Sequence, residues 1–180
     1  ENVANQSSDN IITGVNIDAS GGYGMGGKVS GSKVMNSSVT NSNGYGIFFS
    51  TGIGNTYSGL LLSGNGIAGP GYAAIAIGNN DVMTGSVVSS NLGVGIQVNG
   101  YYSTVSNNMV VSNGAHGIEV LNLPGPTTVT GNNISYSAWS GIYVQASLGT
   151  GVISGNAIYG SNDEGILLSD TPNYVISNNT

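Results

Sequence analysis

Residues that could carry acid–base chemistry gather in the last third of the chain. His116, Ser140 and Glu164 follow one another at intervals of 24 residues, and Trp139 and Asp163 each stand one position before a member of this series. Glycoside hydrolases use two carboxyl groups held a few ångströms apart, and an aromatic ring beside them offers an apolar surface. The pattern indicates either an acid–base groove formed by His116, Asp163 and Glu164 or a solvated turn beside an aromatic contact.

The same part of the chain contains candidate sugar contacts. Glu119 and Tyr143 stand three residues after His116 and Ser140, respectively. A carboxylate accepts hydrogen bonds from hydroxyl groups, and a tyrosine ring combines an apolar face with a polar tip. We therefore take Trp139, Tyr143 and Glu119 as the residues that would contact a sugar in a groove of this kind.

Calcium is the one metal ion that the acidic residues near the C-terminus suggest. Asp163, Glu164 and Asp170 provide carboxylate oxygens, which are the ligands that calcium prefers. A solvated acidic turn explains the same residues without a metal ion. We therefore assign no metal site and keep calcium as the alternative.

The positions of all these residues follow a repeat that is clearest between Thr127 and Pro172. The segments TTVTGNNISYSAWSGIYVQASL and TGVISGNAIYGSNDEGILLSDTP share an Asn, an Ile and a Gly-Ile pair at offsets of 24 residues. A fixed period of about 20–50 residues is the signature of a repeat architecture. Two apolar columns extend the repeat along the chain: Ile47, Ile75, Ile96, Ile118, Ile142 and Ile166 in one, and Ile17, Val39, Leu62, Val88, Val110, Ile134 and Ile158 in the other.

Each repeat has the short-range pattern of β-strands. Apolar and variable residues alternate in runs such as Gly-Ile-Tyr-Val, and Gly, Asn and Ser cluster between the runs. Copies of 22–24 residues with three short strands each predict a coil that closes on itself. Successive coils would stack about 4.8 Å apart, which gives an all-β fold of about seven coils with almost no helix. His116 and Glu164 would then be about 9.6 Å apart, too far for a direct hydrogen bond.

An asparagine recurs at one position of the last repeats. Asn108, Asn132, Asn156 and Asn179 are separated by 24, 24 and 23 residues. Asn tolerates the left-handed backbone conformation that a tight bend needs, and stacked amide side chains can hydrogen-bond to one another. We therefore predict an asparagine ladder along one corner of the coil.

With these motifs the sequence resembles the pectate-lyase-like superfamily of parallel β-helix proteins. The unit V-x-G-N-x-I followed by G-I-x-V is similar to the repeat of that superfamily over roughly Ile12 to Thr180. The resemblance implies a right-handed, single-stranded parallel β-helix (a β-solenoid) with three parallel sheets. It does not select a function, because the superfamily includes polysaccharide lyases, glycoside hydrolases, uronan epimerases, phage tailspikes and surface adhesins.

The resemblance also implies which residues a lyase would need. Lyases of this superfamily resemble one another in using an Arg or Lys base beside acidic calcium ligands. This sequence has no Arg, and Lys28 and Lys33 lie in the irregular first part of the chain without an acidic cluster nearby. We therefore assign no catalytic residue and no cofactor, and the sequence favours a protein without enzymatic activity.

Composition and charge exclude several classes of partner. The chain has 180 residues, no Cys, 6% charged residues and a net charge of −6. Nucleic acids and anionic membranes bind clustered Lys and Arg, and no apolar run approaches the length of about 18 residues that a membrane span needs. We predict neither partner, and we predict a single domain over 1–180 with residues 1–10 as an arm or cap and 11–180 as stacked coils.

The surface chemistry predicts an extracellular or cell-surface location. Asn, Ser, Thr, Gly and Tyr take the place of the usual Lys and Glu, as is typical of secreted proteins. Four Asn-X-Ser/Thr sequons are candidate glycosylation sites in that setting: Asn5, Asn36, Asn133 and Asn178.

Two classes of function remain. The charge-poor surface, coil ends without caps and the outward apolar residues Leu61, Val87 and Met109 favour a structural subunit. Such a subunit would self-associate head-to-tail or laterally into a fibre, sheath or adhesive surface. The alternative is a fragment of a carbohydrate-active or carbohydrate-binding β-helix protein whose partner is a polysaccharide, and a tailspike-like trimer is a third interpretation.

Overall fold

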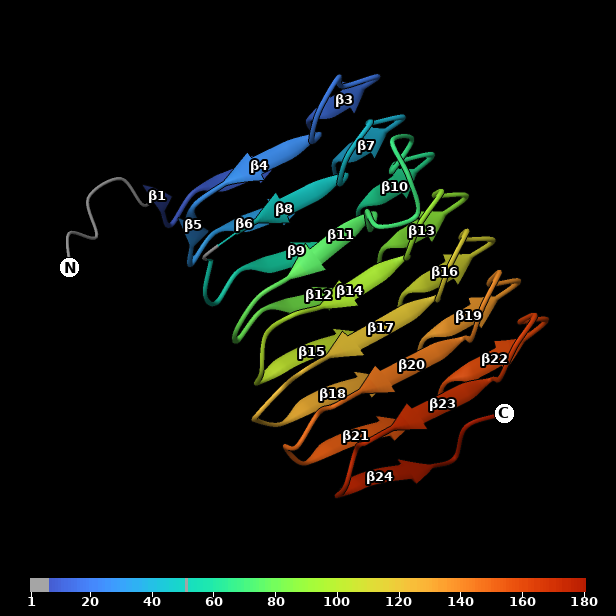
Figure 1. Ribbon diagram of the computed structural model, residues 1–180. Helices are drawn as coiled ribbons and strands as arrows, with labels where there is room; N and C mark the ends of the chain where they lie inside the picture. Colours follow the sequence, from blue (N-terminus) through green and yellow to red (C-terminus); the bar gives the residue numbers. More distant parts are fainter. Residues whose placement is uncertain (1–6, 51) are drawn as a thin grey trace.

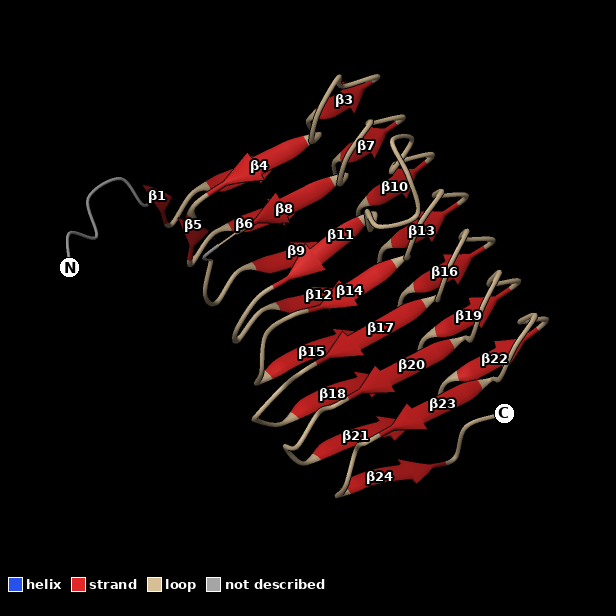
Figure 2. Cartoon of the chain, in the orientation of Figure 1, coloured by secondary structure: helices blue, strands red, loops and turns tan. Residues whose placement is uncertain are grey.

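The chain winds into a parallel β-helix. The computed structural model describes residues 7–50 and 52–180, which form strands, turns and bends but no helix, and so no helix that could cross a membrane. The coils follow one another in chain order from the blue to the red end of the molecule (Figure 1), and strands and loops alone build each of them (Figure 2). The predicted all-β fold of about seven coils with three short strands each is confirmed.

Three parallel sheets form the three faces of the coil, and they are named here in the order in which a coil visits them. The first sheet contains β2 (Ile11–Thr13), β6 (Lys33–Met35), β9 (Thr56–Ser58), β12 (Val82–Thr84), β15 (Ser103–Ser106), β18 (Thr127–Thr130), β21 (Gly151–Ser154) and β24 (Tyr174–Ser177). The second sheet contains β3 (Asn16–Asp18), β7 (Ser38–Thr40), β10 (Leu61–Ser63), β13 (Val87–Ser89), β16 (Met109–Val111), β19 (Asn133–Ser135) and β22 (Ala157–Tyr159). The third sheet contains β4 (Met25–Gly27), β8 (Ile47–Phe49), β11 (Ile75–Ile77), β14 (Ile96–Val98), β17 (Ile118–Leu121), β20 (Ile142–Gln145) and β23 (Ile166–Ser169).

The N-terminal segment over residues 1–10 stays a predicted arm or cap. Its last part is already joined to the coil, because β1 (Ser7–Ser8) pairs in parallel with β5 (Val29–Ser30). The backbone N–H of Asn10 also donates to Ser32 Oγ at 2.9 Å. Polar, non-repetitive residues can add to a sheet because pairing uses backbone groups, which every residue except Pro provides in full. Residues 1–6 of the predicted arm lie outside the described residues.

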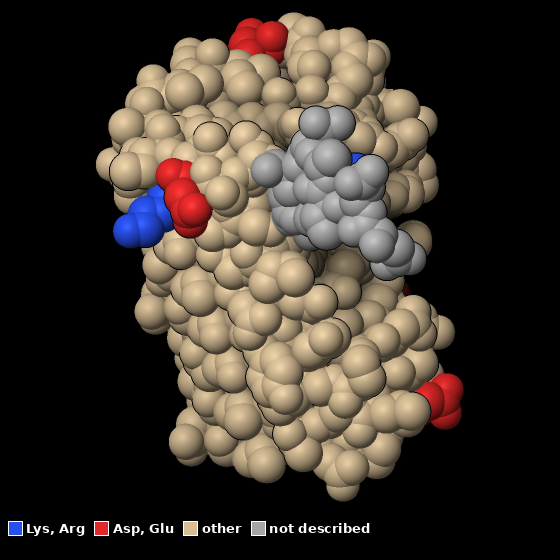
Figure 3. Space-filling view, turned by 90° about the vertical axis from the view of Figure 1, so that its left-hand side faces the viewer, with Lys and Arg blue, Asp and Glu red and all other residues tan. Residues whose placement is uncertain are grey.

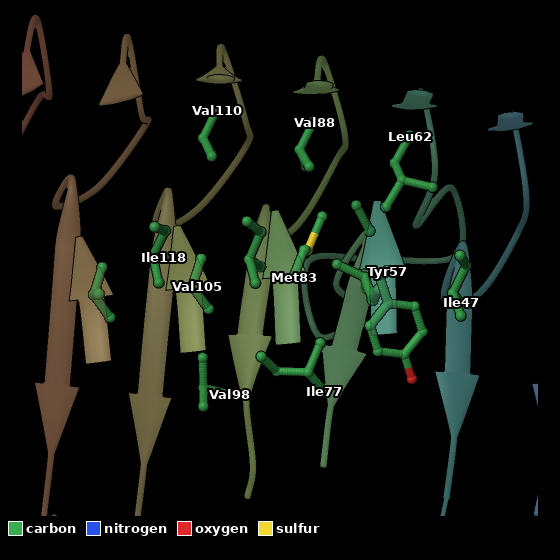
Figure 4. Packing of buried hydrophobic residues seen from close by; sticks show 14 of the residues in the cluster. Ile47, Tyr57, Leu62, Ile77, Met83, Val88, Val98, Val105, Val110 and Ile118 are labelled. Carbon is green, nitrogen blue, oxygen red and sulfur yellow. The ribbon is translucent and has the colours of Figure 1, made fainter. Parts of the chain in front are cut away.

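The core comes from the inward side chains of the short strands. Those of the third sheet are fully buried and lie in register: Ile47, Ile75, Ile96, Ile118 and Ile142. Five members of the predicted column of the second sheet are also buried: Val39, Leu62, Val88, Val110 and Ile134. Its two end members, Ile17 and Ile158, are half-buried and pack against this core. Figure 4 shows such side chains following one another from coil to coil, with Tyr57 among them. Burial of this apolar surface is the main favourable contribution to folding, at about 25 cal/mol per Å².

Asparagine side chains stack at the corner between the first and second sheets. The backbone N–H and the Nδ2 group of Asn108 both donate to Asn132 Oδ1 at 3.0 Å. Asn132 makes the same two bonds to Asn156 at 2.9 and 3.0 Å, and Asn156 makes them to Asn179 at 3.0 and 2.9 Å. The four residues therefore form one continuous hydrogen-bonded ladder, which satisfies buried N–H groups that the bend leaves unpaired.

A second asparagine ladder, which we did not predict, lies at the corner between the second and third sheets. Asn65 donates from its backbone N–H and Nδ2 to Asn91 Oδ1 at 2.9 and 3.1 Å, and Asn91 donates likewise to Asn113 Oδ1 at 3.2 and 2.9 Å. The Gly of the Gly-Ile pair packs against this ladder. A Cβ atom at Gly95 would lie 2.9 Å from Asn113 Nδ2 and 2.5 Å from the carbonyl oxygen of Gly117. Close packing between coils therefore explains why glycine recurs before the inward isoleucine.

The corner between the third and first sheets contains a buried carboxyl group. Asp81 is 1% exposed and accepts hydrogen bonds from the backbone N–H groups of Asn55 and Gly78, both at 2.7 Å. The hydroxyl group of Tyr57 donates to the same carboxyl group at 3.3 Å. Burial raises the pKa of Asp81 above its ordinary value of 3.8, and it also raises the pKa of Tyr57.

This carboxyl group predicts a pH dependence of stability. Because the folded protein favours protonated Asp81, the contribution of this residue to stability is complete below pH 3.8 and falls as the pH rises through the raised pKa. We expect the wild-type free energy of unfolding to fall, relative to that of an Asp81→Asn variant, by about 1.4 kcal/mol for each unit by which the pKa is raised. Urea denaturation from pH 3.8 to neutral pH measures the difference, with the exposed Asp9→Asn as the control. A difference that stays constant with pH would contradict this expectation.

The outer surface carries few charges and includes an apolar strip on the second sheet. Leu61, Val87 and Met109 lie in register on the second sheet, with Leu61 43% and Met109 48% exposed, so these positions face outward as predicted. On the face shown in Figure 3, acidic and basic side chains are few and scattered. Self-association through the strip or through the coil ends stays a prediction.

Candidate functional site

The candidate residues lie on the outer face of the third sheet. The central outward residues of its strands form one file in register: Phe48, Ala76, Gln97, Glu119, Tyr143 and Leu167. Glu119 in β17 is thus paired directly with Tyr143 in β20, and adjacent strands are about 4.8 Å apart. His116 and Trp139 stand in the turns that lead into β17 and β20, at one edge of this face.

Three aromatic rings pack together at this edge. The imidazole of His116 stacks on the ring of Tyr143, with the centroids 4.5 Å apart and the planes at 27°. It meets the ring of Trp139 edge-on, at 5.0 Å and 74°. His116 is only 7% exposed, whereas Trp139 is 45% exposed and Tyr143 is half-buried. His116 therefore holds the other two rings in place, and Trp139 and Tyr143 present aromatic surface to the solvent.

The charge state of His116 follows from its burial. Burial lowers the pKa of His116 below its ordinary value of 6.5, and the negative charges of Glu119, Asp163 and Glu164 only partly oppose this shift. The imidazole is therefore neutral at neutral pH and stacks on Tyr143 without burying a charge. The contribution of neutral His116 to stability is complete above pH 6.5, and it is lost as the pH falls through the lowered pKa.

Hydrogen-bonded carboxylates flank the aromatic cluster along the helix axis. On the N-terminal side, Gln97 Nε2 donates to Glu119 Oε2 at 2.9 Å, and the hydroxyl of Tyr45 donates to Gln97 Oε1 at 3.3 Å. On the C-terminal side, Ser140 Oγ donates to Glu164 Oε2 at 3.3 Å. These bonds orient a carboxylate on each side of the rings.

The outer face of the third sheet also includes a pocket beside β8 and β11. The pocket has a volume of about 400 Å³, and its lining includes Phe48, Ala76 and Asn99. Phe48 stacks on Tyr45 with the centroids 4.8 Å apart, and the insertion between β10 and β11 places Tyr72 edge-on against Tyr45 at 5.4 Å. A volume of this size lies in the usual range for small-molecule sites. The outer face of the third sheet therefore offers aromatic and amide groups across several coils.

The residues that the sequence suggested for catalysis or for calcium binding do not lie together in the structure. His116 and Glu164 belong to coils two apart, as their backbone pairing through Ser140 shows. Glu164, like Asp163, precedes β23 while Asp170 follows it, so a strand about 13 Å long lies between these carboxylates. Among residues 7–50 and 52–180, no three His, Asp or Glu side chains gather as a metal site would require.

The remaining candidate residues concern glycosylation. Asn36, Asn133 and Asn178 have exposed side chains, and Asn5 lies outside the described residues. Exposure is a requirement for an acceptor asparagine, and glycosylation of the three exposed residues stays a prediction.

Tyr45 and Gln97 contribute to the candidate site, through the hydrogen bonds that join them to Glu119, but they were not among the predicted residues. The repeat places Gln97 at the same outward position as Glu119 and Tyr143, so its location could be read from the spacing. The hydrogen bonds of Gln97 could not be predicted from the spacing, because they depend on side-chain conformation. The hydroxyl of Tyr45 reaches Gln97 two strands further along the third sheet, and spacing alone gives no signal for such reach.

Solved structures similar to this chain include two enzymes that are named for polysaccharide substrates. One is the A-module of the mannuronan C-5 epimerase AlgE4 from Azotobacter vinelandii, with a TM-score of 0.83 and 17% identity over 97% of this chain and 54% of that chain. The pectate lyase Pel9A follows with a TM-score of 0.61 and 15% identity over 97% and 56%. The enzymatically active domain of tailspike protein 2 from bacteriophage CBA120 has a TM-score of 0.62 and 12% identity over 97% and 38%. At these identities the likeness shows the fold alone, and the chain spans about half of each structure or less.

The sequence identifies the family independently of these structures. No curated protein sequence matches the chain. The family model described as a right-handed β-helix region matches residues 2–127 and 73–180, which together cover almost the whole sequence. The three parallel sheets of the structure agree with a β-helix. The chain therefore belongs to the right-handed β-helix family.

Proposed function

We propose that the protein binds a polysaccharide on the outer face of the third sheet. The observation that carries this proposal is the cluster of His116, Trp139 and Tyr143 between the carboxylates of Glu119 and Glu164. An exposed aromatic ring can cover the apolar face of a sugar. The neighbouring carboxylates and amides can then bond its hydroxyl groups and fix its orientation.

The extent of the face suits a polymer rather than a single sugar. The file of outward residues runs from β8 to β23, which is five strand steps or about 24 Å. The pocket beside Phe48 lies at one end of this file and the aromatic cluster lies near the other. A chain of several sugar units therefore has room along the helix axis, with contacts in successive coils.

The similar structures support this proposal better than the structural subunit that we predicted first. The mannuronan epimerase and the pectate lyase are named for polysaccharides, and nothing in these similarities favours a fibre or sheath. The proposal concerns binding, since His116 and Glu164 are too far apart to act as a directly bonded pair. We also propose a location outside the cytoplasm, where a polysaccharide partner would be met, and a periplasmic alginate epimerase is among the similar structures.

Affinity gel electrophoresis tests the proposal. The protein is run through native gels that contain one polysaccharide each, both neutral and acidic, with an unrelated acidic protein as the mobility standard. We expect at least one polysaccharide to retard the protein relative to the standard. Identical relative mobility in every gel would contradict polysaccharide binding.

A further inference from the structure

We infer that the polysaccharide bound on this face is uncharged, and that the face discriminates against polymers of uronic acids. This inference rests on the proposed function and deepens it, because it names the chemical class of the ligand. The inferred ligand differs from the uronate polymers for which two similar enzymes, a mannuronan epimerase and a pectate lyase, are named.

Negative charge surrounds the aromatic cluster. Glu119 and Glu164 flank the rings, and Asp163 is exposed beside Glu164. Carboxyl side chains are negatively charged at neutral pH, whereas His116 is neutral there. A uronic acid polymer carries a carboxylate on every unit, so it would bring like charges together beside Glu119, Asp163 and Glu164, in the part of the face from β17 to β23. Juxtaposed like charges are a strong means of rejecting a ligand.

Neither lysine of the sequence lies near enough to offset these acids. The sequence contains two lysines and no arginine. Lys28 follows β4, which is four strand steps or about 19 Å from β17 along the third sheet, and Lys33 lies in β6 on the first sheet. Charges separated by more than about 8 Å are largely screened at physiological ionic strength. In the described part of the chain no cluster of acidic or histidine residues could hold a metal ion as a bridge to a uronate.

The groups that are present suit the hydroxyl groups of a neutral sugar. One oxygen of Glu119 is bonded to Gln97 and one oxygen of Glu164 is bonded to Ser140. Each carboxylate therefore keeps an oxygen that can accept a hydrogen bond from a sugar hydroxyl. The half-buried ring of Tyr143 and the exposed ring of Trp139 supply apolar surface between these acceptors. Such a site needs no charge on its ligand.

Isothermal titration calorimetry with oligosaccharides of matched length tests the inference. The ligands are neutral glucans of several linkages, oligomers of mannuronate, guluronate and galacturonate, and a cationic deacetylated amino-sugar oligomer. We expect at least one neutral ligand to bind at least about tenfold more tightly than any uronate at low salt, and the gap to narrow at about 0.5 M salt, where the repulsion is screened. A uronate or the cationic oligomer that binds more tightly than every neutral ligand would overturn the inference.

Two further outcomes distinguish an error in this inference from an error in the proposed function. Uronate binding that disappears with a calcium chelator would overturn the inference, because it would show an ion-bridged site, while polysaccharide binding itself would stand. The absence of binding to any ligand, neutral or charged, would overturn the proposed function on which the inference rests.

Charge variants show whether the acids cause the discrimination. Glu164→Gln keeps the shape of the side chain and removes its charge, and the matched control is Asp18→Asn, an exposed acid on the second sheet in the first coil. We expect Glu164→Gln to raise the affinity for uronate relative to that for the neutral ligand by about threefold or more, and Asp18→Asn to leave this ratio unchanged. Equal ratios in both variants and in the wild type would overturn the inference.

Discussion

An Asn132→Ala variant should lose about 4 kcal/mol or more of its free energy of unfolding. Asn132 Oδ1 accepts two hydrogen bonds from Asn108, and its Nδ2 group donates to Asn156 Oδ1 and to the carbonyl oxygen of Val105, both at 3.0 Å. Removal of the amide breaks these four buried hydrogen bonds, each worth about 0.5–1.5 kcal/mol, and leaves the Asn108 backbone N–H without an acceptor at a further cost of about 1–3 kcal/mol. Asn108 Nδ2 keeps its bond to the carbonyl oxygen of Met83, and Asn156 Oδ1 keeps its bond from the backbone N–H of residue 132. Because each coil contacts only its neighbours, the loss weakens both adjoining coils.

Urea denaturation followed by circular dichroism measures this loss, and two variants calibrate it. Asn133→Ala changes the neighbouring exposed asparagine and should stay within about 0.5 kcal/mol of the wild type. Asn132→Ser should lie between the two, because serine already fills this position at Ser86, where its Oγ accepts from the Leu60 N–H at 3.1 Å. If Asn132→Ala and Asn133→Ala unfold at the same urea concentration, the ladder does not stabilise the helix.

A Trp139→Ala variant should lose about 30-fold in affinity for the polysaccharide that we propose as the ligand. A sugar ring that covers about 80 Å² of aromatic surface gains about 2 kcal/mol at 25 cal/mol per Å², which corresponds to that ratio. Trp139 is the more exposed of the two solvent-facing rings, and its replacement leaves the stack of His116 on Tyr143 in place. The loss should therefore appear in binding and not in folding.

The chain offers a matched control for this variant. Tyr136 and Tyr159 form another edge-on aromatic pair, with centroids 5.5 Å apart, and both are exposed at the second sheet instead of the third. Tyr136→Ala should bind the polysaccharide as the wild type does, measured by calorimetry with the same oligosaccharide. Equal losses in Trp139→Ala and Tyr136→Ala would show that the binding surface is not confined to the third sheet.

The fold could be predicted because the repeat recurs in isoleucine and glycine positions that few other residue types could fill. The inward isoleucines recur at a fixed phase since each must fill the same place in a narrow core, and the glycine before them recurs because a Cβ atom would strike the next coil. The second ladder escaped prediction because serine shares its positions and an insertion of several residues separates Asn65 from the next inward isoleucine. Asn91 and Asn113 each stand five residues before the next inward isoleucine, and this constant spacing could have predicted the second ladder.

The sequence could predict where the residues of the candidate site stand in the coils, but not how their side chains contact one another. Glu119 and Tyr143 follow from the repeat because a strand alternates inward and outward residues, so their pairing on one face is fixed by register. The stacking of His116 on Tyr143 depends instead on how a turn directs its side chain, and a turn has no such alternation. The residues of the calcium alternative are separated for a related reason: Asp163 and Asp170 are close in sequence, but the strand between them is extended.

The fluorescence of Trp139 tests the central claim most directly, since it is the only tryptophan in the chain and it lies in the aromatic cluster. A neutral oligosaccharide that binds on the outer face of the third sheet should change the emission of Trp139 in a saturable way, with the same midpoint that calorimetry gives. Saturable binding by calorimetry without any change in this emission would place the ligand elsewhere and contradict the account.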